Sequence, residues 1–487
     1  MSVLIKNGNI YDGKNTPTYK ADVLIRGDRI VDIGKHGRKE TEKIIDATDC
    51  IVMPGIIDVN SGSDHYLNLL SDPHQETFIK SGVTSIIGGN CGSSLAPYSR
   101  TGLMSVRKWG IDIVHETNID WQTFKEFLSK LEKRGVGLNF GTLVGHYTLR
   151  SELTKKEGID LTDKEIKNII KIIEKIFKNG AKGLSFGLEY SHSKNIQNRE
   201  FKKIIEGLNN LNKIFTFHLH SYEKLEESIK QVSKFFKNGS DIHFSHLQPI
   251  TSNLEEYKKL QEILDNQKLK NISYDCNPYP ASVIPIYKFL PEWAQKNTLE
   301  EMVNTLKNHG EKIKEHLKSI TSKKVIVAKT TKEFNFYEDK TIKEISENLK
   351  KTQIETLYDL MIKTNLKTVC LYHNINEKVL DEIVFSEKSL IASNGINILV
   401  PGLNVFEIFL KKAIENKEIS LEKAIEKITH KPAERFKIKD RGVLEKNLKA
   451  DVVVIKDFKV KDSILNGDVC LEDGQIKKEK LSGQIIK

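Results

Sequence analysis

Three residues that can bind a metal ion each follow a short strand-like run in a different part of the chain. These residues are Cys91, His218 and His246. Side chains at the carboxyl ends of parallel strands gather on one face of a barrel, so these three can converge. A thiolate and two imidazoles are good ligands for zinc and leave a fourth position open for water. Taken one at a time, each is more often a buried cysteine or a structural histidine, so both interpretations stay open.

The elements that must position these residues lie between Pro54 and about residue 397. Short β-branched runs alternate there with long amphipathic stretches, and the clearest helix is predicted over 163–177. This alternation favours a parallel α/β fold, and a (β/α)₈ TIM-like barrel is the natural candidate. Residues from about 285 to 350 break the rhythm, because they are helical and charged. We expect them to form a helical insertion over the barrel mouth.

Both ends of the chain have the pattern of strands and turns. We expect the two ends to pair into one small β domain. The predicted organisation has the N-terminal part of this domain at 1–53 and the barrel with its insertion at 54–420. A C-terminal helix and the remainder of the β domain follow at 421–487.

Composition limits the class of protein. The chain has 487 residues, 38% hydrophobic content and a formal net charge of +10. It contains no apolar run of membrane-spanning length and no signal-peptide pattern, so we expect a cytoplasmic protein without a membrane partner. Lysines lie among glutamates, which is typical of solvated helix surfaces, and we expect no nucleic-acid partner. The five cysteines are widely spaced and odd in number, which argues against a disulfide framework.

A series of motifs runs along nearly the whole chain. These are PGIID at 54–58, GVTSIIGGNCGSSLAP at 82–97, VGHYTLR at 144–150, GAKGLSFGLEY at 180–190, FHL at 217–219, SHL at 245–247, DCNPYPA at 275–281, LPEWA at 290–294 and PAERF at 432–436. Together they resemble the amidohydrolase superfamily, specifically its D-aminoacylase (N-acyl-D-amino-acid deacylase) family. The resemblance implies metal-dependent hydrolysis of a non-peptide C–N (amide) bond in a small N-acyl amino acid or similar amide.

The resemblance also implies roles for individual residues. Cys91, His218 and His246 match the ligands of a tightly held zinc ion, and His220 falls where the family usually has an arginine. One zinc ion is therefore the expected cofactor. The candidates for substrate binding are His146, Tyr190 and Tyr279.

Three positions depart from the family pattern. The family places a weaker second metal on an HxH pair and on the aspartate of a late SDG motif, and this aspartate also shuttles the proton. The corresponding residues here are Asn60, Gly62 and Asn394. An amide cannot accept and return a proton near neutral pH, so acid–base work at Asn394 is lost. The family's His-Pro-Arg segment is also not visible at 396–402.

Two interpretations of these departures remain at this point. The chain is an amidohydrolase with impaired or altered catalysis, in which Asp64 and His65, on the same loop as Asn60, are the candidates for compensation. Alternatively it is a non-catalytic pseudoenzyme, which would be a binding or regulatory protein on the same barrel. Fold alone cannot decide between them.

Overall fold

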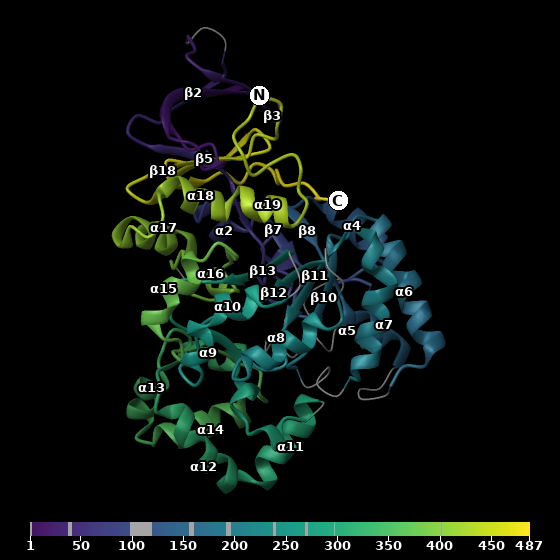
Figure 1. Cartoon of the computed structure of the whole chain (residues 1–487). Helices are drawn as coiled ribbons and strands as arrows, with labels where there is room; N and C mark the ends of the chain where they lie inside the picture. Colours follow the sequence, from purple (N-terminus) through teal and green to yellow (C-terminus); the bar gives the residue numbers. More distant parts are fainter. Residues whose placement is uncertain are drawn as a thin grey trace.

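The computed structural model of the chain describes residues 2–37, 41–97, 119–154, 160–190, 196–236, 240–267, 271–296, 298–400 and 402–487. Figure 1 shows a sheet near both chain ends at the top, parallel strands and helices in the middle, and a mainly helical part at the bottom. None of the described helices combines the length and apolar character needed to cross a membrane.

The middle of the molecule contains two sheets of parallel strands. The first has the order β6-β7-β8, and the second has the order β17-β13-β12-β11-β10-β9. Their bounds are β6 (Ile56–Asp58), β7 (Val83–Gly88), β8 (Asn139–Thr142), β9 (Val144–Gly145), β10 (Gly183–Gly187), β11 (Ile214–His218), β12 (Asp241–Phe244), β13 (Asn271–Cys276) and β17 (Ser389–Ile391). The predicted parallel α/β fold is confirmed. No ladder between β6 and β17 closes these sheets into a barrel within the described residues. The backbone N–H of Asn394 donates to the backbone carbonyl of Asn60 at 2.9 Å.

Helices pack around these strands because each buries one apolar face. Helix α6 (Asp163–Lys178), where the periodicity predicts a helix, begins at a capping box formed by Thr162 and Glu165. Its buried face includes Ile166, Ile169 and Ile173. The other helices of this part are α1 (Asn68–Ser71), α2 (Glu76–Lys80), α4 (Phe124–Arg134), α5 (His146–Thr154), α7 (Asn198–Leu208), α8 (Leu225–Ser233), α9 (Leu254–Lys258), α10 (Leu260–Asp265), α15 (Glu377–Phe385), α16 (Ile396–Leu399), α17 (Val405–Asn416), α18 (Leu421–Ile428) and α19 (His430–Arg435).

One nine-stranded sheet combines strands from both chain ends, as the two strand-rich ends predict. Strand β5 pairs antiparallel with β18, and this ladder joins the two halves. The strands are β1 (Ser2–Ile10), β2 (Tyr19–Arg26), β3 (Arg29–Gly34), β4 (Lys43–Asp46), β5 (Ile51–Pro54), β18 (Val452–Lys456), β19 (Lys459–Leu465), β20 (Asp468–Glu472) and β21 (Gln475–Ile476). We call it the terminal sheet.

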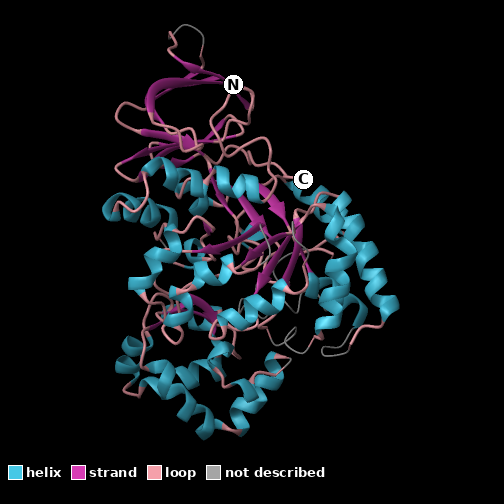
Figure 2. Ribbon diagram, viewed as in Figure 1, coloured by secondary structure: helices cyan, strands magenta, loops and turns pink. Residues whose placement is uncertain are grey.

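The segment 282–372 has a buried cluster of its own, which begins at Ile286 and ends at Tyr372. It contains helices, as its charged amphipathic pattern indicates, and also a three-stranded sheet that the pattern does not predict (Figure 2). Its elements are β14 (Ser282–Pro285), η2 (Ile286–Phe289), η3 (Glu292–Ala294), α11 (Leu299–Asn308), α12 (Gly310–Thr321), β15 (Val325–Lys329), η4 (Lys332–Tyr337), α13 (Ile342–Leu349), α14 (Gln353–Lys363) and β16 (Val369–Tyr372).

Candidate metal centre

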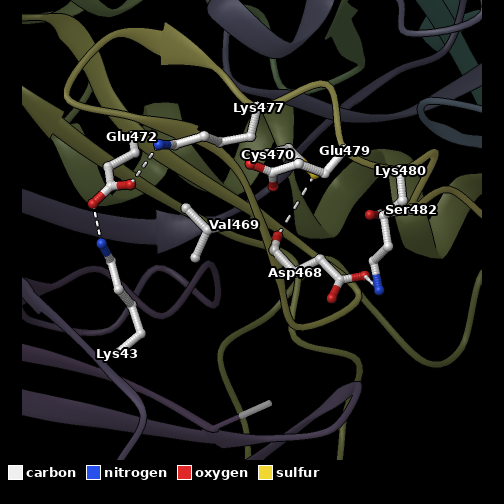
Figure 3. Close-up of a pocket in the computed structure, with 9 residues that line it drawn as sticks. All are labelled: Lys43, Asp468, Val469, Cys470, Glu472, Lys477, Glu479, Lys480 and Ser482. Atoms are coloured by element: carbon white, nitrogen blue, oxygen red, sulfur yellow. Dashed lines mark hydrogen bonds and ion pairs between the residues drawn. The ribbon is translucent and has the colours of Figure 1, made fainter.

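A pocket of about 390 Å³ opens on the terminal sheet, but its chemistry does not suggest a reactive site (Figure 3). Its charged side chains pair with one another. Glu472 binds both Lys43 and Lys477, and Lys480 lies 2.6 Å from Asp468. None of the strand-end residues predicted to bind a metal ion lines this pocket.

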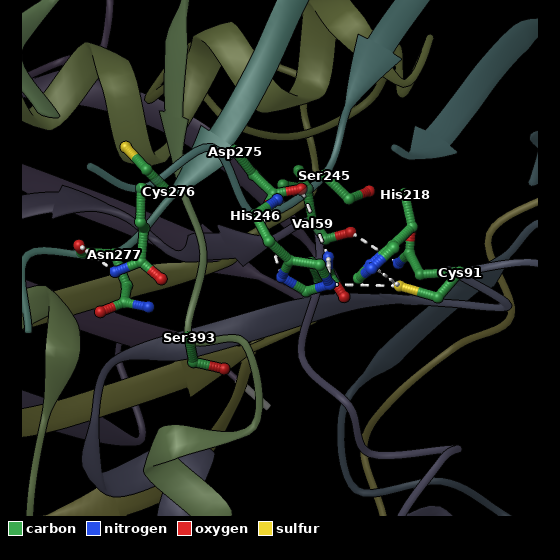
Figure 4. Close-up of polar contacts among 12 residues, drawn as sticks. Val59, Cys91, His218, Ser245, His246, Asp275, Cys276, Asn277 and Ser393 are labelled. Carbon is green, nitrogen blue, oxygen red and sulfur yellow. Dashed lines mark hydrogen bonds and ion pairs between the residues drawn. The ribbon is translucent and has the colours of Figure 1, made fainter. Parts of the chain in front are cut away.

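The structure brings Cys91, His218 and His246 together (Figure 4). The Cys91 Sγ lies 3.1 Å from His246 Nε2 and 3.8 Å from His218 Nδ1. One ligand atom from each residue lies within 4.8 Å of the others. Tetrahedral zinc with ordinary bond lengths to sulfur and nitrogen separates the two ligand atoms by about 3.6 Å. The donor set and its spacing therefore fit a zinc ion.

The loop of Cys91, which follows β7, is held in place by residues of β10. The Ser185 hydroxyl donates to the Gly89 carbonyl at 2.5 Å and accepts from the Gly92 amide at 3.0 Å. A Cβ at Gly187 would lie 2.1 Å from the Cys91 carbonyl oxygen, so only glycine permits this close approach. The serine and glycine of the GLSFGLEY segment thus fix the cysteine loop.

His218 ends β11 and is buried among aromatic rings and one carboxylate. Its Nε2 lies 2.9 Å from Glu189 Oε2, and its Nδ1 lies 3.3 Å from the Tyr190 hydroxyl. The Tyr190 ring is tilted against the imidazole, with centroids 4.5 Å apart. Lys288 Nζ contacts the other oxygen of Glu189 at 2.8 Å. Burial raises the pKa of the Glu189 carboxyl, but Lys288 and His218 outweigh burial and hold this pKa well below its usual range.

His246 follows β12 and is fixed by a fully buried aspartate of β13. Asp275 Oδ1 accepts the His246 backbone amide at 3.1 Å, while its Oδ2 lies 3.1 Å from His243 Nε2. The Asn60 amide group also donates to this Oδ2, at 3.3 Å. Burial raises the pKa of Asp275, yet the hydrogen bond from His243 and the nearby imidazoles produce a net lowering. Asp275 therefore connects the histidine ligand to the loop after β6.

Burial also sets the protonation of the cluster. It raises the pKa of the Cys91 thiol well above its ordinary value, so that the thiol keeps its proton unless a cation lies beside it. Burial lowers the pKa of His246 to about 4, against the opposing effect of Asp275. The imidazole is therefore neutral near pH 7, which is the form that binds metals.

Three residues at the site have left-handed backbone conformations without being glycine. Their φ angles are 53° at Cys91, 60° at His246 and 51° at Asn394. Such conformations cost about 1–3 kcal/mol each and concentrate at functional sites. Their occurrence at three strand ends supports a functional role for this face of the molecule.

The positions that depart from the family pattern form a packed, neutral surface beside the cluster. The Asn60 amide nitrogen lies 3.5 Å from His246 Nε2. A Cβ on Gly62 would lie 3.0 Å from the Tyr66 ring, and one on Gly395 would lie 2.6 Å from it. Tyr66 thus fills the space that a larger side chain at position 62 would need. Neither polar atom of the Asn394 side chain has a hydrogen-bond partner among the described residues.

Asp64 and His65, the candidates for compensation, each have a hydrogen bond to the backbone of the loop that carries Cys91. Asp64 Oδ2 accepts the Gly89 amide at 2.6 Å, and His65 Nε2 lies 3.3 Å from the Ser93 carbonyl oxygen. Both side chains are buried. These contacts hold the loops around Cys91.

The three candidates for substrate binding lie in different surroundings. Tyr190 contacts His218 as described. His146 is buried, and its Nε2 pairs with Glu200 at 2.9 Å, beside Arg150, which binds the same carboxylate. Tyr279 is half-buried, and its ring faces His373. The described contacts of His146 and Tyr279 are not with the metal cluster.

Sequence reasoning did not find the supporting roles of Asp275 and Lys288. Asp275 belongs to a matched motif, DCNPYPA, so a signal was present in its position. Lys288 lies in a segment with no recognisable pattern at that position, and its contact with Glu189 spans 99 residues. Only the folded structure reveals such a pair.

Comparison with known proteins shows which proteins the chain resembles. The chain matches no protein-family profile. D-aminoacylase of Alcaligenes xylosoxydans xylosoxydans is 28% identical over 241 residues, which are 49% of this chain and 48% of that protein. N-acyl-D-aspartate deacylase of the same organism is 26% identical over 289 residues, 57% of this chain and 56% of that protein. The chain thus spans about half the length of the curated relatives it matches.

Solved structures share the fold. A crystal structure of D-aminoacylase, which defines a subset of amidohydrolases, superposes with a TM-score of 0.78. N-acyl-D-glutamate deacylase from Bordetella bronchiseptica, in complex with zinc and a phosphonate inhibitor, gives 0.81. Each is 20% identical and covers 99% of both chains. The chain is a homologue of the D-aminoacylases. This relationship confirms the predicted resemblance, and the fold of the chain combines a parallel α/β part with a β domain.

Proposed function

We propose that this D-aminoacylase homologue is a metal-dependent amidohydrolase that cleaves the amide bond of a small N-acyl amino acid or similar amide. The convergence of Cys91, His218 and His246 carries this proposal, because three distant strand ends present a zinc donor set. Relatives named for deacylation of N-acyl-D-aspartate and N-acyl-D-glutamate support it.

The three residues would hold one zinc ion, and the neutral surface formed by Asn60, Gly62 and Tyr66 disfavours a second ion. When bound, such an ion lowers the pKa of water and polarises a carbonyl group. Asp275 fixes the backbone of His246, so that the imidazole keeps its orientation.

Two further side chains suit the substrate. Burial raises the pKa of Tyr190 well above its ordinary value, so that its hydroxyl stays protonated and can donate to a carbonyl oxygen. The side-chain amide of Asn394 offers N–H donors and a carbonyl acceptor, which match the acceptor and donor of a substrate amide. Asn394 binds the substrate in this proposal and moves no proton.

We also propose that the parallel strands close into a (β/α)₈ barrel within about 54–420, with a small β domain at 1–53 and 421–487. The backbone hydrogen bond from Asn394 to Asn60 supports closure between β17 and β6. The segment from about 285 to 350 then covers the barrel mouth, and the contact of Lys288 with Glu189 supports this placement.

The proposal is tested by hydrolysis of N-acyl amino acids of both configurations with the purified full chain. We expect turnover of at least one substrate, lost in Cys91→Ala and His246→Ala. Cys370→Ala is the matched control, since Cys370 is a buried cysteine in β16, outside the cluster. Metal-loaded protein with no turnover of any substrate would contradict the proposal and favour a binding role.

A further inference from the structure

A line of contacts leads from the segment 282–372 to one of the three candidate metal ligands. Lys288, in η2, places its Nζ 2.8 Å from Glu189 Oε1. Glu189 Oε2 lies 2.9 Å from His218 Nε2. His218 Nδ1, the remaining ring nitrogen, lies 3.3 Å from the Tyr190 hydroxyl and 3.8 Å from Cys91 Sγ. One carboxylate oxygen of Glu189 thus contacts Lys288, and the other contacts His218.

This arrangement selects one tautomer of His218. A carboxylate only accepts hydrogen bonds, so the ring nitrogen that faces Glu189 must carry the proton. The lone pair is then on Nδ1, directed towards the thiol of Cys91, where a metal ion would bind. A carboxylate that accepts the other ring N–H of a ligating histidine fixes the tautomer of that histidine and raises its basicity.

Lys288 restricts the orientation of the Glu189 carboxylate. The carboxylate is mostly buried, with 29% of its side chain exposed, and Lys288 is also mostly buried. An ammonium at one oxygen restricts rotation of the carboxylate away from the imidazole at the other. Lys288 precedes Phe289, a member of the separate buried cluster of the segment 282–372, so this segment anchors the pair.

We propose that Glu189 is a positioning residue for His218, and that Lys288 holds Glu189 in place, so that the segment 282–372 helps to set the geometry of the metal site. This inference rests on the proposed function, because it takes His218 as a metal ligand. It assigns no role in proton transfer to either residue.

The test measures metal affinity and the tautomer of His218 in the full chain. Glu189→Met removes the acceptor at similar length, and Glu189→Asp keeps the charge but shortens the reach. The controls alter another lysine–glutamate pair, Lys329 and Glu338, which are 3.0 Å apart and both lie within the segment 282–372. Zn²⁺ affinity is measured by competition with a chromophoric chelator, and ¹⁵N spectra of metal-free protein report which ring nitrogen is protonated.

We expect Glu189→Met to lose about 10- to 100-fold in Zn²⁺ affinity. Glu189→Asp also loses affinity, because reach as well as charge is needed, and Glu338→Met keeps it. Lys288→Met, unlike Lys329→Met, gives a mixture of His218 tautomers in the metal-free protein. A purely structural ion pair would instead lower the melting temperature of metal-free protein and leave Zn²⁺ affinity intact.

Unchanged affinity in both Glu189 variants would overturn the inference, as would failure of the unsubstituted chain to bind Zn²⁺. A single His218 tautomer in Lys288→Met would show that Lys288 is not needed to hold Glu189 in place. The proposed function fails separately: Zn²⁺ binding that depends on Glu189, without hydrolysis of any N-acyl amino acid, would contradict hydrolysis and leave the positioning role supported.

Discussion

At the scale of single residues, the site combines retained ligands with altered neighbours. Cys91 and His246 adopt strained backbone conformations, and Asn394 does so where the family has an aspartate. The Asn394 amide has the shape of a carboxylate but not its basicity. Because of this difference in basicity, an asparagine at position 394 can bind a substrate amide but cannot transfer a proton to it.

Replacing Asn394 by aspartate tests this distinction. The left-handed conformation at position 394 suits aspartate nearly as well as asparagine. We expect Asn394→Asp to raise kcat by about tenfold or more, because a missing general base typically costs 10²–10⁴-fold. Asn394→Ala serves as the control, since it alters the same side chain without adding a base. An equal or lower kcat in Asn394→Asp would show that the site does not use a carboxylate there.

At the scale of elements, the ends of β6 and β17 are joined by a buried carboxylate. Asp58 Oδ2 accepts the Ser393 hydroxyl at 2.5 Å, and Oδ1 accepts the amides of Ser393 and Asn60 at 3.2 and 3.1 Å. Burial nevertheless raises the pKa of Asp58 from 3.8 to about 6. The connection between the two strands is therefore sensitive to pH.

This raised pKa predicts the direction of a pH effect. The folded state binds the Asp58 proton more tightly than the unfolded state, so its stabilising contribution is full below pH 4 and is lost as pH rises through 6. Relative to Asp58→Asn, the free energy of unfolding of the unsubstituted chain should fall by about 2 kcal/mol between pH 4 and pH 7. Denaturant titrations at several pH values measure this difference. Parallel curves for the two proteins would refute the raised pKa.

At the scale of the whole molecule, the parallel strands lie between the terminal sheet and the segment 282–372 (Figure 1). A buried polar network joins the terminal sheet to β8. Asp451 accepts from Arg441 at 2.9 Å and from the side chain of Asn139 at 2.8 Å. On the other side, the pair of Lys288 and Glu189 reaches the candidate ligand His218. The parallel strands therefore have polar contacts with both flanking parts, and the contact with the segment 282–372 is the one that reaches the site.

Much of this organisation is predictable from local patterns. Helix α6 follows from isoleucine spacing and its capping box. The three candidate ligands are predicted from their places after strand-like runs only together with the motifs that resemble the D-aminoacylase family. Local patterns do not predict three other features. These are the hydrogen bond from the Gly89 amide to Asp64, the packing of the Tyr66 ring beside Gly62, and the contact of Lys288 with Glu189. Each depends on the relative placement of distant backbone segments, which periodicity and motif spacing do not contain.

The most direct test of the central claim is the metal content of the full chain, purified without added metal and compared with Cys91→Ala. If Cys91, His218 and His246 form the metal centre, the unsubstituted protein retains about one zinc ion per chain and Cys91→Ala retains none. Absence of bound metal in the unsubstituted protein, or equal metal in both proteins, would contradict the claim.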